Sequence, residues 1–88
     1  MDFEQKVRSE HYKNDLPYGR QPQVLAAYNQ REHEVVTEFM TDLKAWMVEQ
    51  GVPQQYVSKL ASKAWEDGHA HGFSEILNVS YGLVEIFQ

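Results

Sequence analysis

The sequence lacks cysteine altogether and has only three prolines and five glycines among its 88 residues. Without cysteine there can be no disulfide, no thiolate zinc site of the zinc-finger kind and no thiol nucleophile. The same absence suits a reducing compartment. Apolar runs are short and the first residues, Met-Asp-Phe-Glu-Gln-Lys, are rich in charge, so we expect neither a membrane-spanning segment nor a secretory signal. These absences predict a cytoplasmic protein that makes no contact with a membrane.

Basic residues are also scarce, with 8 Lys and Arg against 13 Asp and Glu, which gives a net charge of −5. Nucleic-acid binding requires Lys and Arg to neutralise phosphates, so we expect no nucleic-acid partner. Imitation of DNA by the chain's own carboxylates would need dense acidic runs, and here Lys44, Lys59 and Lys63 dilute the acids.

The few prolines and glycines divide the chain into segments that predict an all-α fold. Residues 23–50 contain neither, and their apolar residues recur at intervals of three, four and seven, as on one face of a helix. The main positions of this stripe are Leu25, Tyr28, Val35, Phe39, Leu43 and Trp46. Gly51 is well placed to cap this helix and Pro53 to begin the next one. A link this short favours antiparallel neighbours, so we predict a long antiparallel helical hairpin.

The second long helix is predicted over residues 53–78, although two glycines interrupt the pattern. A glycine inside a helix costs about 1 kcal/mol relative to alanine, which leaves open that the helix ends at Gly68. If it continues, as we expect, Ala64, Gly68 and Gly72 form a strip of small residues at i, i+4 and i+8 that allows close helix packing. Residues 79–88 form an apolar tail that could finish the helix, cover the core or bury against a second copy.

Residues 1–22 are predicted to form a short N-terminal helix or arm followed by a connector. Phe3 and Val7 lie four positions apart and share a helix face. Pro17 and Pro22 push the residues before them toward extended geometry, so the connector is not helical.

The whole chain, 1–88, is predicted to form a single helical domain near the lower size limit for independent stability. Both long helices carry aromatic residues that need cover, so we expect a homodimer or higher oligomer that completes the hairpin as a bundle. The alternative is that the N-terminal segment covers this face and gives a monomeric three-helix fold. The large aromatic residues of the two helices are predicted core residues: Phe39, Trp46, Trp65 and Phe73.

A cluster of tyrosine and basic residues surrounds the connector. Tyrosine and arginine are enriched at binding surfaces, so this cluster is the predicted partner- or ligand-binding site. Its members are Tyr12, Lys13, Tyr18, Arg20 and Tyr28. The alternative interpretation is that these side chains pin the connector to the helices.

The densest group of ionisable residues contains Glu66, His69 and His71, which are the candidate metal ligands. On a helix the two imidazoles point nearly opposite ways, so we expect a solvated face, with no metal, no cofactor and no catalytic residue. Glu66 and His69 also form one Glu-x-x-His unit. Di-iron carboxylate bundles use two such units with two further glutamates, which Glu34 or Glu38 of a dimer could supply. The position of these glutamates beside the apolar stripe favours a solvated acidic edge instead.

The segment 64–75, with the sequence Ala-Trp-Glu-Asp-Gly-His-Ala-His-Gly-Phe-Ser-Glu, resembles segments of small, uncharacterised bacteriophage-encoded accessory proteins. The size, the acidity and the lack of cysteine are similar to those of phage early, host-takeover proteins that bind and inhibit a host factor. The resemblance implies an accessory role in the host cytoplasm and assigns no functional residue.

The sequence therefore predicts a non-enzymatic protein–protein interaction module that binds itself and a host protein, such as a phage inhibitor of a host enzyme or defence complex. One alternative is an oligomer that sequesters a small nucleotide or metabolite, with the connector cluster as its contacts. A second alternative is a metal-dependent helical-bundle enzyme that uses the group around His69.

Overall fold

The computed structural model describes residues 2–9, 11–12 and 22–88, and in the last range it describes side chains from residue 34 onward. Its elements are the helices α1 (Phe3–Arg8), α2 (Pro22–Glu49), α3 (Gln54–Gly68) and α4 (Phe73–Val84), with the 3-10 turns η1 (His69–His71) and η2 (Glu85–Phe87). This part of the chain contains no strand, which confirms the all-α prediction. None of its helices combines the length and the apolar character needed to cross a bilayer.

α1 begins at a complete capping box. The Asp2 side chain accepts a hydrogen bond from the Gln5 backbone N–H (2.8 Å), and the Gln5 side chain accepts one from the Asp2 N–H (3.2 Å). These bonds satisfy amide groups that the first turn of a helix leaves unpaired. Val7 is buried and Phe3 is half-buried, so the predicted short N-terminal helix is present and buries the predicted face.

α2 matches the predicted helix to within one residue at each end. Among the side chains of α2 that the structure describes, from residue 34 onward, the buried ones follow the predicted stripe: Val35, Phe39, Leu43, Trp46 and Met47. The side chains of Leu25 and Tyr28 lie outside this range. After the helix, Gly51 adopts a φ of +96° and the Val52 N–H donates to the Met47 carbonyl oxygen (3.1 Å). Glycine allows this cap because it has no Cβ to clash in the left-handed region. Pro53 is then the N-cap residue of α3, so the predicted turn is where the sequence placed it.

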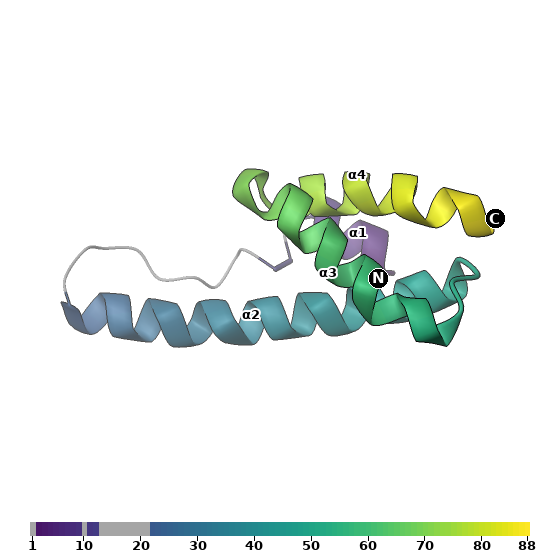
Figure 1. Ribbon diagram of the computed structural model, residues 1–88. Helices are drawn as coiled ribbons and strands as arrows, with labels where there is room; N and C mark the ends of the chain where they lie inside the picture. The colour runs from purple at the N-terminus through teal and green to yellow at the C-terminus, as the bar shows by residue number, and fades with distance from the viewer. Residues whose placement is uncertain (1, 10, 13–21) are drawn as a thin grey trace.

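The prediction of one continuous helix over residues 53–78 is wrong. α3 ends at Gly68, η1 follows, and the chain reverses at Gly72, whose φ is +102°. α4 then packs against α3 (Figure 1). A Cβ on Gly68 would lie 2.7 Å from the backbone N and Cα of Ile76 in α4. The absence of a side chain at Gly68 therefore allows α3 and α4 to pack closely against each other.

The predicted strip of small residues is divided by the same reversal. Ala64 and Gly68 are buried in α3, whereas Gly72 lies between η1 and α4. The second arm of the predicted hairpin is accordingly two shorter helices. Most of the tail 79–88 is helical, because α4 continues to Val84 and η2 follows it. The tail thus completes α4 instead of the one long helix that the first alternative assumed, and its Val84 is buried in the core.

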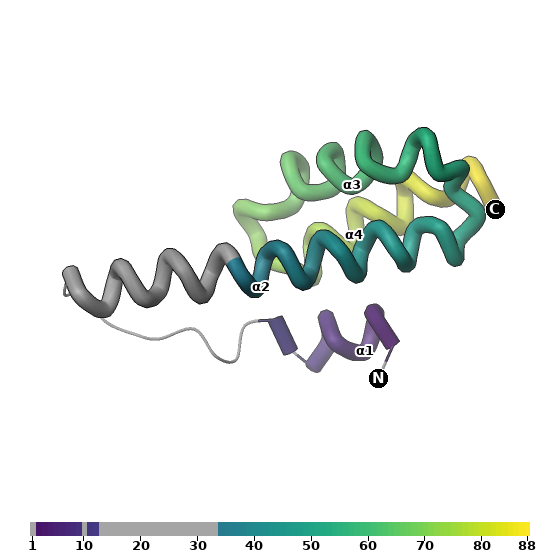
Figure 2. Tube along the Cα trace, turned by 90° about the horizontal axis from the view of Figure 1, so that it is seen from below, coloured from purple at the N-terminus to yellow at the C-terminus, as the bar shows by residue number. Residues whose placement is uncertain are grey.

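The core lies where α1, α3 and α4 meet the C-terminal half of α2, with α1 and α3 on opposite sides of α2 (Figure 2). The Phe39 ring of α2 lies 5.4 Å from Phe3 of α1 and 4.7 Å from Phe73 of α4, measured between centroids. Of the predicted core aromatics, Phe39 and Trp46 are buried, and Phe73 and Trp65 pack half-buried against the core. α1 thus covers apolar side chains of α2 and α4 within one chain, as the alternative interpretation required.

Candidate interaction surface

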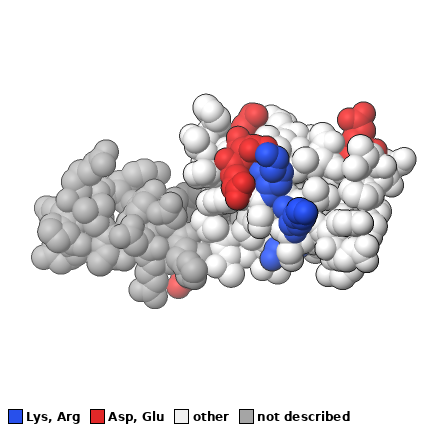
Figure 3. Space-filling view, in the orientation of Figure 1, with Lys and Arg blue, Asp and Glu red and all other residues white. Residues whose placement is uncertain are grey.

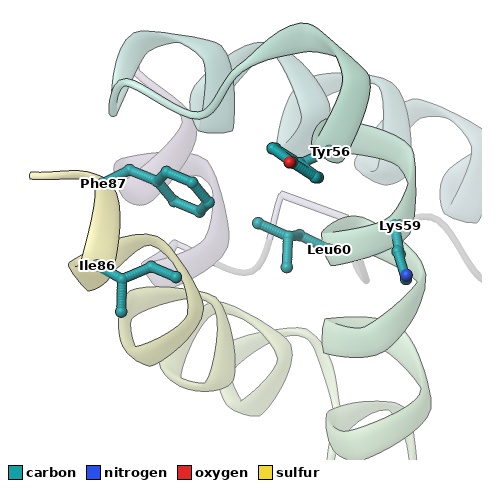
Figure 4. Close-up of a pocket in the computed structure, with 5 residues that line it drawn as sticks. All are labelled: Tyr56, Lys59, Leu60, Ile86 and Phe87. Atoms are coloured by element: carbon teal, nitrogen blue, oxygen red, sulfur yellow. The ribbon is translucent and has the colours of Figure 1, made fainter.

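A groove with apolar walls opens where the last residues of the chain lie beside the start of α3. It has a volume of about 370 Å³. Its lining consists of Tyr56, Lys59 and Leu60 from α3 and Ile86 and Phe87 from η2, and we call these five residues the C-terminal groove. In Figure 4 the Phe87 ring points toward Tyr56 and Leu60, while Lys59 lies on the far side.

Two large hydrophobic side chains that line the C-terminal groove are strongly exposed to solvent. Ile86 is 81% exposed and Tyr56 is 44% exposed. The Tyr56 and Phe87 rings are stacked, with centroids 6.1 Å apart and planes at 28°. Single exposed apolar residues are ordinary, but a contiguous apolar surface is typical of a binding site. The C-terminal groove is therefore the candidate contact surface.

The η2 wall of the groove is held against the turn between α2 and α3. Gln88 Nε2 donates a 2.6 Å hydrogen bond to Gln50 Oε1 in that turn. A Cβ on Gly51 would lie 3.2 Å from the Phe87 carbonyl oxygen, so glycine at this position leaves room for η2. Val84, just before η2, is buried in the core. The groove is thus a fixed feature of the packing between the turn, α3 and the end of α4.

One charged residue lines the C-terminal groove, and another precedes the groove residue Ile86 in the sequence. Lys59 lines the α3 wall, and the exposed Glu85 precedes Ile86 in η2. Neither forms an ion pair with another residue that the structure describes, whereas Lys63, one turn further along α3, pairs with Asp67 at 3.3 Å. Figure 3 shows basic and acidic side chains side by side over α3 and a separate acidic group toward the C-terminal end of α4. Lys59 is therefore the one charged residue among the five that line the groove.

Tyr12, a predicted contact residue, is part of the core. It is 1% exposed, and its hydroxyl donates a 2.7 Å hydrogen bond to Asp42 Oδ2. Its ring packs edge-on against Phe39 at a centroid distance of 5.1 Å. Burial, together with the hydrogen bond to Asp42, raises the pKa of Tyr12 well above its usual value. The prediction of a contact residue is wrong here, and the alternative, a tyrosine that pins this segment to the helices, describes Tyr12.

The remaining members of the predicted cluster are not placed relative to it. Lys13, Tyr18 and Arg20 lie outside the described residues. Tyr28 lies in α2, but its side chain belongs to the part of the helix that is not described. A role for these four residues stays a prediction.

Glu4 of α1 joins three helices through its carboxylate. Its Oε1 accepts a 3.1 Å hydrogen bond from Trp46 Nε1 of α2, and its Oε2 accepts a 2.9 Å bond from the Tyr81 hydroxyl of α4. Burial and the bond to Glu4 raise the pKa of Tyr81. These bonds satisfy the polar ends of two aromatic side chains, which explains why α1 docks in one orientation.

The acidic edge predicted on α2 contacts Lys6 of α1 and His11, which follows α1. Glu38 Oε2 lies at hydrogen-bond distance, 2.9 Å, from His11 Nε2, and Asp42 forms an ion pair with Lys6 Nζ at 3.3 Å. Glu34 and Glu38 are both exposed. A role of Glu38 in the di-metal site considered from the sequence would therefore compete with its hydrogen bond to His11.

The candidate metal ligands lie on the surface near the reversal between α3 and α4. His69 stacks on Trp65, with planes at 8° and centroids 5.3 Å apart, and its Nδ1 donates a 2.9 Å hydrogen bond to the Trp65 carbonyl oxygen. Glu66 and His71 are exposed. Within the described ranges, no three His, Asp or Glu side chains are grouped so that they could hold a metal ion.

Comparison with known proteins identifies the family of this fold. A family of unknown function, DUF8546, matches residues 2–88. The chain belongs to the DUF8546 family. No curated protein and no solved structure matches it. The DUF8546 match spans every helix, so the C-terminal groove and the docking contacts of α1 both belong to the family's domain.

Sequence reasoning did not single out the C-terminal groove of this DUF8546 protein. Tyr56 and Leu60 belong to the apolar face predicted for the second helix, and Ile86 belongs to the apolar tail. These segments are far apart in the sequence, and only the reversal at Gly72 brings them together. The one available signal was the alternative in which the tail buries against a second copy.

Proposed function

We propose that this DUF8546 protein is a non-enzymatic protein–protein interaction module whose contact surface is the C-terminal groove. The observation that carries the proposal is Ile86, which is 81% exposed beside a groove with apolar walls. Covering a side chain of this size removes apolar area from water and contributes about 1.5–3 kcal/mol. Tyr56 adds an exposed aromatic ring of the kind enriched at binding hot spots.

The narrower proposal is a bacteriophage inhibitor of a host enzyme or defence complex that acts in the host cytoplasm. Its support is the resemblance of residues 64–75 to phage accessory proteins. The net charge of −5 adds a physical argument, because an acidic chain associates faster with a partner that presents a basic surface.

The oligomer predicted from the sequence is also part of the proposal. α1 already covers the apolar side chains that α2 and α4 share, through Phe3 and its contacts with Phe39 and Trp46. A second copy would therefore have to bind elsewhere. The C-terminal groove is an apolar surface that the described part of the chain leaves open, and it is the place that we propose for a second copy.

Affinity capture with matched surface variants tests the interaction module. The full chain carries an N-terminal tag and is exposed to lysate from its natural source, as wild type, as Ile86→Asp and as Val48→Asp. Val48 is 47% exposed on α2 and does not line the groove, so it controls for the added charge. We expect the wild type and Val48→Asp to retain one protein in fixed stoichiometry and Ile86→Asp to lose it.

Thermal unfolding of both variants shows whether they fold, and exposed positions of this kind are expected to shift stability by less than about 0.5 kcal/mol. If Ile86→Asp captures as much of the protein as the wild type does, the groove is not the contact surface. Equal loss of the captured protein in both variants would show a charge effect without a site.

A second candidate is the sequestration of a small molecule, and Lys59 is the observation that favours it. The volume of about 370 Å³ falls within the range of small-molecule pockets, about 300–1,000 Å³. Lys59 is the one charged residue among the five that line the groove, so a small amphipathic anion is the class of ligand that this lining would favour. A thermal-shift screen of nucleotides and carboxylate metabolites tests this function. A rise in melting temperature that Lys59→Ala abolishes supports it, and the absence of any rise rejects it.

A further inference from the structure

We infer that the face of α2 and α4 beneath α1 is a second binding surface, separate from the C-terminal groove, and that it takes an amphipathic helix of a partner protein. α1 occupies this surface as a cover made by the chain itself, and the partner helix replaces it. We call the surface the α1 seat. Its residues are Phe39, Asp42 and Trp46 of α2 and Phe73 and Tyr81 of α4.

The aromatic rings of the α1 seat form two pairs that join α2 to α4. The centroids of Phe39 and Phe73 lie 4.7 Å apart. Those of Trp46 and Tyr81 lie 5.7 Å apart. Phe3 of α1 lies against this row, 5.4 Å from Phe39 and 6.0 Å from Trp46. Apolar side chains presented by two helices are the kind of surface that binds the apolar face of a third, so the contacts of α1 show what the seat accepts.

The polar atoms of the α1 seat specify the chemistry of the helix that fits it. Trp46 Nε1 and the Tyr81 hydroxyl both donate to the Glu4 carboxylate, at 3.1 and 2.9 Å. Asp42 Oδ2 accepts a 3.3 Å hydrogen bond from Lys6 Nζ. A matching partner helix therefore carries an aromatic residue followed by an acidic one, and then a basic and an aliphatic residue three and four positions after the aromatic one, as α1 does.

α1 is a separable part of the fold. It has six residues, and a helix this short is not stable in water unless it docks. Within the described ranges, no backbone hydrogen bond joins α1 to another helix. The side chains of Lys6 and Asp42 are 29% and 28% exposed, so water can replace their ion pair at a cost of about 0.2–1 kcal/mol.

The rest of the chain has packing of its own that does not involve α1. α3 packs against both α2 and α4, and a Cβ on Gly68 of α3 would lie 2.7 Å from the backbone of Ile76 in α4. Val57 and Ala61 of α3 and Ile76 are at most 2% exposed. We therefore expect α1 to undock as a unit while α2, α3 and α4 stay packed. Docked α1 excludes the partner helix, so its contact with the seat is autoinhibitory.

Binding of a synthetic peptide tests the α1 seat. The peptide comprises residues 1–12 with a fluorescent label, and it is titrated into the full chain as wild type, as Val7→Asp and as Phe3→Ala. Both substitutions remove an apolar anchor of α1 and change no residue of the seat. Gln5→Glu is the matched control, because it adds the same charge as Val7→Asp at an exposed position and keeps the capping box.

Fluorescence anisotropy measures the affinity for the peptide. We expect Val7→Asp and Phe3→Ala to bind it about tenfold more tightly than the wild type and Gln5→Glu do, because the weakened α1 no longer competes for the seat. Circular dichroism and hydrogen exchange of the same variants report whether α2, α3 and α4 stay folded.

Two further variants locate the bound peptide. A peptide with Glu4→Ala should bind Val7→Asp about tenfold more weakly, because Trp46 and Tyr81 then lack their acceptor. Adding Ile86→Asp to Val7→Asp should leave the affinity unchanged, because Ile86 lines the C-terminal groove and is not part of the seat.

Three results overturn the inference. If Val7→Asp and Phe3→Ala both lose the helices α2, α3 and α4, then α1 is an integral part of the core. If both variants stay folded and bind no peptide, or bind the Glu4→Ala peptide equally well, the seat does not recognise a helix of this chemistry. If Ile86→Asp abolishes binding, the peptide occupies the C-terminal groove, and the seat is rejected while the proposed function stands. Failure of the lysate capture through Ile86 would instead reject the proposed function and leave this inference intact.

Discussion

The hydroxyl of Tyr12 donates a 2.7 Å hydrogen bond to Asp42 Oδ2, which fastens the residues after α1 to the middle of α2. Asp42 also pairs with Lys6 of α1 at 3.3 Å. The tyrosine is buried and the carboxylate is half-buried, so the two residues join the aromatic core to its polar rim. This pair and the bonds of Glu4 add to the apolar contacts of Phe3 and Val7 that hold α1 in place.

Tyr12→Phe keeps the ring in the core and removes only the hydroxyl. Hydrogen bonds to charged groups contribute more than neutral ones, and the partly exposed Asp42 can recover a water, so we expect a loss of about 1–2 kcal/mol in the free energy of unfolding. Urea denaturation at neutral pH measures it. Tyr56→Phe is the matched control, because no described residue hydrogen-bonds to its hydroxyl, and it should leave stability unchanged.

Alkaline pH should destabilise the wild type through the same residue. Burial holds the pKa of Tyr12 above its usual value, so above about pH 10 the unfolded chain releases this proton while the folded chain keeps it. The free energy of unfolding therefore falls as pH rises past that point. Tyr12→Phe lacks this contribution, so its stability and that of the wild type should converge between about pH 8 and pH 11. If the unfolding free energies of the wild type and Tyr12→Phe instead stay a constant distance apart over this range, Tyr12 has the same pKa in the folded and unfolded chains.

Two glycine substitutions should change stability in opposite directions. In Gly68→Ala the new Cβ meets the backbone of Ile76 at 2.7 Å, so α3 and α4 must separate, and we expect a loss of about 1–3 kcal/mol. In Gly82→Ala, within α4, the Cβ has no atom within 4 Å, and the better helix former should add up to about 1 kcal/mol. Paired thermal unfolding of the two variants checks both signs. Equal effects would mean that helix propensity alone, without the close contact, governs Gly68.

Glu4→Ala should loosen α1. The change leaves Trp46 Nε1 and the Tyr81 hydroxyl without their acceptor, so we expect a loss of about 1–3 kcal/mol and a more polar environment for Trp46. Tryptophan fluorescence in a Trp65→Phe background, followed through denaturation, reports both effects. Glu85→Ala removes an exposed carboxylate that has no described partner and serves as the control. An unshifted Trp46 emission in the Glu4 variant would show that apolar packing alone docks α1.

The parts of the fold that sequence reasoning predicted are those decided by neighbours along the chain. The apolar stripe of α2 needs only the helical repeat, and the turn after it needs only a glycine that adopts positive φ followed by a proline. The short helix around Phe3 and Val7 likewise follows from their spacing along the chain. In each case the interactions that fix the structure join residues a few positions apart.

The division between α3 and α4 could not be decided in this way. A continuous helix through Gly68 and Gly72 and a reversal between them are both compatible with the local pattern, and they differ by propensities of about 1 kcal/mol for each glycine. The packing of α3 against the backbone at Ile76 selects the reversal. That choice in turn places η2 beside α3 and creates the C-terminal groove.

The sequence by itself determined an all-helical, acidic, cysteine-free chain with one long amphipathic helix and a glycine–proline turn, because composition and periodicity act over a few residues. Only the tertiary structure decided that Tyr12 is buried against Asp42 and that Ile86 projects beside Tyr56. Burial of a tyrosine or exposure of an isoleucine depends on which distant segment lies opposite. The packing of whole helices decides which segments lie opposite each other, and a pattern of neighbouring residues does not specify that packing.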